Sequence, residues 1–411
     1  MPGVHDLQSV DASNRQGASD PRALLLGRAW GRWRGEWRGS NRLICGEDCW
    51  ILEEDGCETA RWPELSEALR TLWPRRRVRD HRPWAVGWIG YEAAARFAGS
   101  LPIRKSPDSA PAGMLLLEPD AVRSSIEVGR QPTTVHGSAK WSLDADAFRK
   151  RVAAIRERIA AGGVYQVNLC RRMTVEGWQA SLGSLAAAAS RGGVADYLSR
   201  FIYDEGELLC ASMELLLRRR GDRLETRPIK GTRGRGSTPA EDRKRVADLA
   251  LDPKERAELA MIVDLERNDL GRVSQLGSVV VRDTGTVESY ASIHHRVARL
   301  TARVRPDLEW WDVLAAMAPG GSVTGCPKIA AMSLIMQLET VPRGPFTGAL
   351  GVVAGDGDLE MALPIRSAWK VGSKLEFAAG CGIVWDSDPA SEERESCLKV
   401  ARWLELIGGA A

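Results

Sequence analysis

Lys230 stands in a stretch whose composition suits the presentation of an amine to an anion. The stretch, PIKGTRGRG at residues 228–236, holds three cations and three glycines in nine residues. The proline and isoleucine that precede Lys230 predict an extended approach, and Gly231 allows the backbone to turn directly after it. The sequence therefore predicts a shaped basic loop with Lys230 aimed at an anionic group.

Three glutamates have surroundings that suit acid–base or metal chemistry. Glu214 interrupts the apolar run at residues 211–217, which favours a buried carboxyl with a raised pKa, unless the side chain faces water at a strand end. Glu392 and Glu395 lie one turn apart on a predicted helix. Such a pair is usually solvated, and it becomes a metal site only where a third carboxylate faces it.

Two further stretches predict polar surfaces. Gln166 and Asn168 alternate with apolar residues in the strand predicted for residues 164–172, so that both amides share one face. The glycine-rich residues 319–328 precede a predicted helix, whose first backbone N–H groups can form an anion site. Nucleotide binding is excluded there, because Cys326 occupies the lysine position of the P-loop motif.

The elements that must position these side chains are short strands and a few helices. A hairpin predicted from residues 207–217 and 224–228 leads directly to Lys230. His294 and His295 are adjacent in a predicted strand, so they face opposite sides and at most one belongs to any single site. Helices are predicted at residues 148–161, from Pro239, from Pro253, at residues 327–338 and from Pro389. Further strands are predicted at residues 84–92, 278–283, 287–300, 348–353, 362–369 and 375–379.

The bulk composition excludes several classes of protein. The chain has 411 residues, 44% of them hydrophobic, and its 57 basic and 54 acidic residues are interspersed, which argues against nucleic-acid binding. No apolar run reaches the ~20 residues of a membrane helix, and the eight cysteines lack zinc-like spacing. We expect a reduced cytoplasmic protein with no membrane or nucleic-acid partner. It should have a disordered tail (1–20), an N-terminal subdomain (21–140) and a catalytic domain (141–411) intertwined with it.

From about residue 148 to residue 404, the chain resembles the chorismate-utilising enzymes, which include anthranilate, aminodeoxychorismate, isochorismate and salicylate synthases. The segments that carry the resemblance are residues 165–169, 228–232, 261–273, 319–328 and 380–384. The resemblance implies an α+β fold, with two large and mainly antiparallel β-sheets in a sandwich. Helices would pack outside the sandwich, and the active site would lie in a cleft.

Two positions divide this family by reaction. Anthranilate synthases carry alanine at the position of Lys230, whereas aminodeoxychorismate synthases carry lysine. Members that add water carry lysine at the position of Gln166, whereas members that use ammonia carry glutamine. At both positions this chain resembles component I of the aminodeoxychorismate synthases. That branch of the family aminates chorismate at C4 for p-aminobenzoate and folate synthesis.

The resemblance also implies residue roles. Lys230 would be the nucleophile that forms a covalent adduct at C2 of chorismate, and Arg233, a metal or burial would lower its pKa. Glu214 would be the general acid. Gln166 would be the third catalytic residue. The ligands of a Mg²⁺ cofactor would be Glu258, Glu392 and Glu395. The substrate would contact Thr232, His295, Thr324, Gly325, Arg366, Cys381 and Gly382.

Some positions depart from the family pattern and keep alternatives open. Met213, Cys326, Val352 and Cys381 replace the usual residues, and the thiol of Cys381 could either crowd a substrate carboxylate or face away. Ortho-amination, giving anthranilate or aminodeoxyisochorismate, is therefore an alternative, as is a non-catalytic chorismate-binding or glutaminase-anchoring protein.

No glutaminase nucleophile motif occurs in the sequence, so ammonia is expected from a separate glutaminase subunit in a heterodimer, or from solution. The Leu-Leu-Glu-Ser signature of tryptophan-regulated relatives is also missing.

Overall fold

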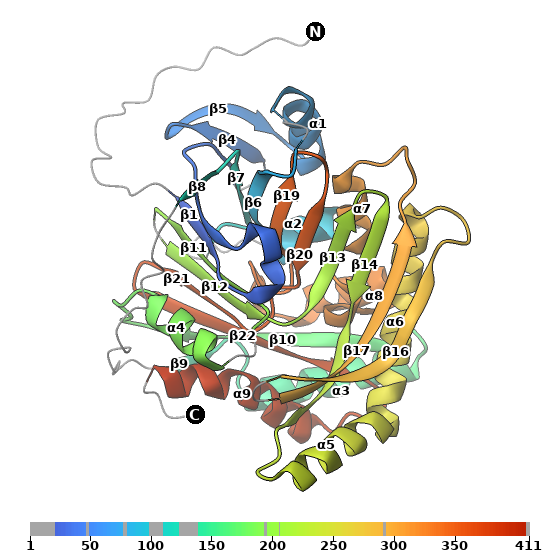
Figure 1. Ribbon diagram of the computed structural model, residues 1–411. Coiled ribbons are helices and arrows are strands. Elements are labelled where there is room, and N and C mark those ends of the chain that lie inside the picture. Colours follow the sequence, from blue (N-terminus) through green and yellow to red (C-terminus); the bar gives the residue numbers. More distant parts are fainter. Residues whose placement is uncertain are drawn as a thin grey trace.

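The fold is built on two large antiparallel sheets with helices on their outer faces (Figure 1). It is known from a computed structural model, which describes residues 21–46, 49–76, 80–97, 110–122, 139–192, 195–204, 206–290 and 293–407. The prediction of an α+β sandwich is confirmed. The tail predicted at residues 1–20 lies outside the described residues.

The first sheet combines strands from both ends of the chain. Its strands are β1 (Arg22–Leu25), β2 (Gly35–Arg38), β8 (Asp120–Val122), β9 (Ala139–Trp141), β10 (Gln166–Val175), β11 (Tyr197–Tyr203), β12 (Gly206–Ser212), β18 (Gly325–Cys326), β21 (Ser367–Val371) and β22 (Lys374–Ile383). Their order is β18-β10-β22-β21-β12-β11-β1-β2-β8, and β9 pairs with β10.

The second sheet has the same mixed origin. Its strands are β3 (Arg42–Cys45), β4 (Trp50–Glu54), β5 (Cys57–Trp62), β6 (Pro83–Ile89), β7 (Gly113–Leu117), β13 (Leu215–Arg220), β14 (Arg223–Arg227), β15 (Ile229–Gly234), β16 (Val280–Ser289), β17 (Ile293–Arg303), β19 (Ala349–Ala354) and β20 (Leu359–Ala362). Their order is β15-β17-β14-β13-β20-β19-β6-β7-β3-β4-β5, and β16 pairs with β17.

The helices cover the two outer faces. Their bounds are η1 (Arg28–Trp33), α1 (Leu65–Arg76), α2 (Tyr91–Phe97), α3 (Ala145–Ala160), α4 (Gly183–Gly192), α5 (Pro239–Leu251), α6 (Pro253–Val273), α7 (Trp310–Met317), η2 (Gly321–Val323), α8 (Lys328–Leu338) and α9 (Pro389–Leu406). Helices α3, α4, α8 and α9 contact the first sheet, whereas α1, α6 and α7 contact the second. Fully buried side chains such as Phe201 and Trp369 from one sheet and Val86 and Leu350 from the other fill the space between the sheets.

Three helices that carry or flank the site begin where the sequence predicts. Thr238, Asp252 and Asp388 each accept a hydrogen bond from a backbone N–H of the first turn of α5, α6 and α9, and a proline follows each cap. These caps satisfy N–H groups that have no partner inside the helix. No helix within the described ranges is long and apolar enough to cross a membrane.

Two segments that we predicted as single strands are divided between the sheets. Residues 207–217 run from β12 in the first sheet to β13 in the second, and residues 362–369 run from β20 in the second sheet to β21 in the first. The prediction of continuous strands was wrong because mainly apolar residues lie on both sides of each crossing. A sequence pattern alone does not distinguish one long strand from two strands in facing sheets.

The two crossings are hydrogen-bonded to each other. The backbone N–H of Leu363 donates to the carbonyl of Glu214 (3.0 Å), and the N–H of Ala211 donates to the carbonyl of Arg366 (3.1 Å). Arg366 also has a φ of 51°, in the left-handed region that non-glycine residues rarely adopt. The crossings thereby take Glu214 and Arg366 out of the regular sheet faces and place them at the open junction between the sheets.

The basic loop predicted around Lys230 is instead a strand. Lys230 lies in β15 and pairs with Arg296 of β17, and the register shifts between Lys230 and Thr232. Gly231 occupies this bulge with a φ of 81°, which glycine adopts without strain. A bulge redirects the neighbouring side chains, and here it permits both Lys230 and Thr232 to face the same cavity.

Candidate active site

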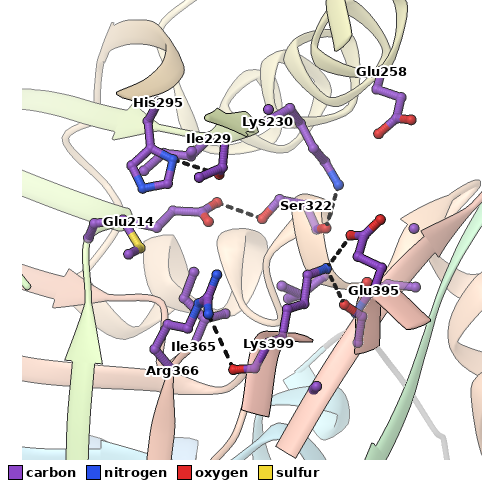
Figure 2. Close-up of a pocket in the computed structure, with 18 of the residues that line it drawn as sticks. Glu214, Ile229, Lys230, Glu258, His295, Ser322, Ile365, Arg366, Glu395 and Lys399 are labelled. Carbon is purple, nitrogen blue, oxygen red and sulfur yellow. Dashed lines mark hydrogen bonds and ion pairs between the residues drawn. The ribbon is translucent and has the colours of Figure 1, made fainter. Parts of the chain in front are cut away.

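A cavity of about 560 Å³ opens where the chain crosses between the sheets. Figure 2 shows that its labelled residues come from several elements and converge on one space. Of the thirteen predicted site residues, the cavity is lined by Glu214, Lys230, Thr232, Glu258, His295, Arg366, Gly382, Glu392 and Glu395.

Ser322 joins the proposed acid to the proposed nucleophile. Its hydroxyl donates to Oε1 of Glu214 (2.6 Å), and its carbonyl oxygen accepts from Nζ of Lys230 (3.3 Å) (Figure 2). Burial raises the pKa of Glu214 to about 7, and the Ser322 hydrogen bond and the Lys230 charge only partly oppose this effect. Ser322 therefore lies between the amine of Lys230 and the carboxyl of Glu214, which can carry a proton.

His295 provides a neutral imidazole on the same wall. Thr232 lies opposite His295 in the β15–β17 pairing, and its Oγ1 is 2.9 Å from Nδ1 of the ring. Burial lowers the pKa of His295 to about 4, so the ring is uncharged near neutral pH. Its Nε2 is buried without a hydrogen-bond partner among the described residues, which leaves it available to a substrate oxygen. His294 faces the other way and contacts Asp242 (2.9 Å), as the alternation predicts.

Arg366 carries the positive charge best placed for a substrate carboxylate. Its guanidinium donates to the backbone carbonyl of Lys399 (3.2 Å), and no carboxylate lies within 4.0 Å of it in the described part of the chain. A guanidinium presents paired N–H donors that match a carboxylate. The side chain therefore retains free donors in the cavity.

Three carboxylates from two helices line the opposite part of the cavity. Glu258 comes from α6, and Glu392 and Glu395 come from α9. Burial raises the pKa of Glu258 and of Glu392, and repulsion from neighbouring carboxylates adds to both shifts. Burial also acts on Glu395, but the ammonium of Lys399, at 2.7 Å, holds the pKa of that carboxyl below its usual range.

This donor set fits a divalent cation with hard oxygen ligands, such as Mg²⁺. Burial is the main cause of the raised pKa of Glu258 and of Glu392, and neighbouring carboxylates add to it. A bound cation would favour the charged form of these carboxyl groups, with Glu258, Glu392 and Glu395 as the holding residues. The nearby thiol of Cys381 is a soft ligand that suits Mg²⁺ poorly, and it contacts the backbone carbonyl of Glu392 instead (3.4 Å).

Arg233 does not act on Lys230 in the way that the sequence suggests. Its guanidinium contacts Asp252 (2.8 Å) and Glu255 (3.3 Å), both near the start of α6. The charge of Arg233 is therefore compensated locally.

Gln166 lies directly behind the cavity wall. Both its amide atoms are buried and lack hydrogen-bond partners among the described residues. A Cβ added to Gly382 would lie 2.7 Å from the Gln166 amide nitrogen and 3.5 Å from Nζ of Lys230. Because Gly382 has no side chain, the amide of Gln166 and the amine of Lys230 can both lie close to its Cα.

Three residues predicted to bind substrate do not line the cavity. The hydroxyl of Thr324 is buried and donates to the carbonyl of Gly320 (2.9 Å), so it shapes the glycine-rich turn. Gly325 allows close contact with the backbone of Gln166, because a Cβ there would lie 2.1 Å from its carbonyl oxygen. Cys381 is fully buried among the helices outside the first sheet.

Ser322 and Lys399 are site residues that the sequence did not reveal to us. Ser322 lies inside the glycine-rich segment that we had marked only as a backbone anion site. Lys399 lies four residues after Glu395, a helical spacing that could have revealed the ion pair. Its ammonium also donates to the carbonyl of Gly380 (2.7 Å).

The family model described as chorismate binding enzyme matches residues 22–405. The chain belongs to this family. Anthranilate synthase component 1 1 of Haloarcula marismortui is 39% identical over 254 residues, covering 62% of this chain and 52% of that protein. Aminodeoxychorismate synthase component 1 of Bacillus subtilis (strain 168) is 37% identical over 277 residues, covering 66% of this chain and 58% of that protein. The chain thus spans little more than half the length of these curated relatives.

Solved structures show the same fold as this chorismate-binding enzyme. Anthranilate synthase component I from Streptococcus pneumoniae TIGR4 superimposes with a TM-score of 0.75 and 22% identity, over 98% of this chain and 94% of that one. The isochorismate synthase DhbC from Bacillus anthracis gives a TM-score of 0.70 at 22% identity, over 90% and 96% of the two chains. The prediction of the family is confirmed. Relatives named anthranilate synthase and relatives named aminodeoxychorismate synthase match at similar identity, so the branch of the family stays a prediction.

Two adjacent residues of β22 allow a test of which side chains face the cavity. Cys381→Ala should change kcat/KM by less than about twofold, because the thiol is buried away from the cavity, and should cost about 1 kcal/mol in the free energy of unfolding. Gly382→Ala should lower kcat/KM at least about tenfold, because the new methyl group would crowd Gln166 and Lys230. Steady-state kinetics and urea unfolding measure both effects, and a larger kinetic loss in Cys381→Ala would contradict this assignment.

Proposed function

We propose that the protein aminates chorismate at C4 and forms 4-amino-4-deoxychorismate. One observation carries the proposal: Ser322 contacts both the amine of Lys230 and the carboxyl of Glu214, and the position that separates the branches of the family is occupied by lysine. Arg366 faces this pair from the other crossing, and three carboxylates line the far wall.

The reaction follows from what these groups can do. The neutral amine of Lys230 adds at C2 of chorismate, and the two ring double bonds shift as the C4 hydroxyl leaves. Glu214 gives its proton to the departing oxygen, so that water is released. Ammonia then adds at C4, the double bonds shift back, and the lysine amine leaves from C2. The proton that the new C4 ammonium releases returns to Glu214, which restores the free enzyme. Two successive displacements retain the original stereochemistry at C4.

The remaining residues bind and orient the substrate. Arg366 pairs with a substrate carboxylate, His295 offers a neutral imidazole to a substrate oxygen, and Gln166 places its amide near the incoming ammonia. Glu258, Glu392 and Glu395 would hold a Mg²⁺, which would supply positive charge for binding the dianionic substrate. These side chains fix the reacting carbon near Lys230.

The direct test is product analysis. The protein should convert chorismate, in the presence of Mg²⁺ and ammonium, to a product that a separate lyase cleaves to p-aminobenzoate. Mass spectrometry and NMR establish the position of the new amino group. An ortho-aminated product would contradict the proposal, and no turnover of chorismate would favour a non-catalytic binding protein.

Ortho-amination is the second candidate because several relatives of comparable identity are named anthranilate synthase component 1. The names of the relatives also support a partner, since component 1 implies a second component. We infer that this is a separate glutaminase that supplies ammonia. Adding such a subunit should allow glutamine to replace ammonium in the assay.

The pH dependence of kcat/KM provides a test of Glu214. A general acid must be protonated, and the pKa of Glu214 in the substrate-free protein is raised to about 7, so kcat/KM should fall about tenfold per pH unit above that value. His295, with a pKa lowered to about 4, remains neutral over this range and contributes no such limb. Glu214→Gln should lower kcat by about 10²–10⁴-fold and remove the limb.

Glu266 is the matched control for this profile. Burial raises its pKa to about 8, and its carboxyl accepts from Thr226 (2.7 Å) behind the cavity. Glu266→Gln should retain the alkaline limb of the kcat/KM profile. Loss of the limb in Glu266→Gln and its survival in Glu214→Gln would reverse the assignment.

A further inference from the structure

Six arginines gather around a second cavity, of about 610 Å³, which shares no residue with the active site. It lies on strands β13, β14, β17 and β16, which are side by side in the second sheet (Figure 1). The arginines that line it are Arg218, Arg220, Arg223, Arg282, Arg299 and Arg303.

The register of the strands sets three of these arginines directly opposite one another. Arg220 of β13 pairs with Arg223 of β14, and Arg223 pairs in turn with Arg303 of β17. Like charges at directly opposed positions destabilise a sheet. Arg220 contacts Glu360 and packs over the Trp33 ring (4.5 Å), and Arg303 contacts Asp222 (3.1 Å), so within this row only Arg223 has no carboxylate partner in the described part of the chain.

The carboxylates nearby compensate only part of the charge. Glu225 accepts from Arg299 (3.1 Å to each oxygen) and lies 3.6 Å from Arg218. Glu360 contacts Arg218 and Arg220, and Asp222 contacts Arg303 (3.1 Å). These three carboxylates therefore serve four of the six arginines.

Arg223 and Arg282 are the two arginines that no carboxylate compensates among the described residues. Both are exposed, and neither has a carboxylate oxygen within 4.0 Å in that part of the chain. Arg282 donates a hydrogen bond to the hydroxyl of Thr301 (3.2 Å), which leaves its charge uncompensated. Both guanidinium groups are therefore free to bind an external anion.

The local charge contrasts with the rest of the molecule. The whole chain carries a net charge of only +3, so this concentration of arginine is not part of a generally basic surface. Arginine, with its planar set of donors, is the side chain best suited to bidentate binding of phosphate. The cavity volume falls within the range of small-molecule sites, about 300–1,000 Å³. Small residues such as Gly277, Ser278 and Ala302 complete its wall and leave that space open.

We propose that this cavity binds a small polyanion that carries two or more phosphate groups. One phosphate contacts Arg223 and the neighbouring row of arginines, and another contacts Arg282 on the far side of β17. This site is independent of the proposed amination of chorismate.

Calorimetric titration with inorganic pyrophosphate, without metal and at about 0.15 M ionic strength, tests the proposal. Binding should be saturable, with a Kd of about 0.1 mM or tighter, and at least about tenfold tighter than binding of monophosphate. The double variant Arg223→Gln/Arg282→Gln should weaken the affinity for pyrophosphate at least about tenfold. It should leave the rate of chorismate turnover unchanged, so the outcome is separate from that of the proposed function.

Two control variants show whether the loss of affinity is specific to this cavity. Arg158→Gln/Arg243→Gln removes the same charge from exposed positions on α3 and α5 and should leave pyrophosphate affinity unchanged. Arg366→Gln, in the active site, should also leave it unchanged. Equal losses in all three variants, no saturable binding up to about 5 mM, or binding of a polyglutamate peptide without binding of pyrophosphate would each overturn the proposal.

Discussion

Lys230→Ala should lower kcat for chorismate amination by about 10³-fold or more, with saturating ammonium and Mg²⁺. The reason is that the amine, 3.3 Å from the Ser322 carbonyl and adjacent to the protonatable Glu214, would be the group that forms the covalent bond to substrate. KM for chorismate should change much less, because Arg366 and the carboxylate set remain in place. Initial rates measured by product formation give both constants.

The variant Lys230→Arg distinguishes a nucleophile from a simple positive charge. Arginine keeps the cation, but it does not become a neutral amine near pH 7. We therefore expect Lys230→Arg to be nearly as slow as Lys230→Ala. Unchanged rates in Lys230→Ala would exclude any essential role, and near-normal rates in Lys230→Arg alone would show that the residue acts only through its charge.

Much of this site could be predicted because strand alternation is a local property. Gln166 and Asn168 share one face of β10, and their amides are the atoms that a Cβ at Gly382 or Gly380 would meet across the strands. The same rule predicts that His294 and His295 face opposite sides, and the structure places His295 at the cavity and His294 against Asp242. The two-residue period decides which side chains share a face, whereas the resemblance to the family singled out Gln166 and His295 as site residues.

The crossings between sheets could not be predicted in this way. Glu214 and Arg366 are flanked on both sides by mainly apolar residues that belong to different sheets. The strands end where two backbone hydrogen bonds join the crossings, one from Leu363 to Glu214 and one from Ala211 to Arg366. The residues in each bond are about 150 positions apart. Such pairing is a tertiary property, and it decides where the two charged side chains point.

Cys381 illustrates the same limit at a single residue. In the sequence it replaces a glycine of the family pattern, and both orientations of the thiol remained possible. The pairing of β22 with β10 directs it outwards, where burial raises the pKa of the thiol to about 12. The substitution at this position is thereby compatible with an open cavity, whereas a side chain at Gly382 would not be.

Ser322 was missed for a related reason. A serine between two apolar or glycine neighbours has no sequence signature of its own. Its role depends on contact with Glu214, 108 positions earlier, and with Lys230, 92 positions earlier. Only the packing of η2 between α6 and the crossings brings these three residues together.

Glu258→Gln should abolish most of the Mg²⁺-dependent activity and weaken Mg²⁺ binding by at least about 10–100-fold. The amide removes one of the three negative charges that converge on the cavity, and the pKa of Glu258 is already raised by burial and by neighbouring carboxylates. Activity as a function of Mg²⁺ concentration, together with calorimetric Mg²⁺ binding in the absence of substrate, measures the effect. The binding measurement separates the loss of the cation from a loss of catalysis.

Glu255→Gln is the matched control on the same helix. Glu255 lines the same cavity one turn before Glu258, but Arg233 already contacts its carboxylate at 3.3 Å. Lys254 also lies near Glu258, but at 3.8 Å, so Glu255 has the closer cationic partner. Removal of the Glu255 charge should therefore change Mg²⁺ affinity by less than about threefold. Equal effects of the two substitutions would mean that the cavity responds to its total charge rather than to one ligand. A specific loss in Glu258→Gln alone would identify α6 as the source of the third carboxylate, opposite the pair on α9.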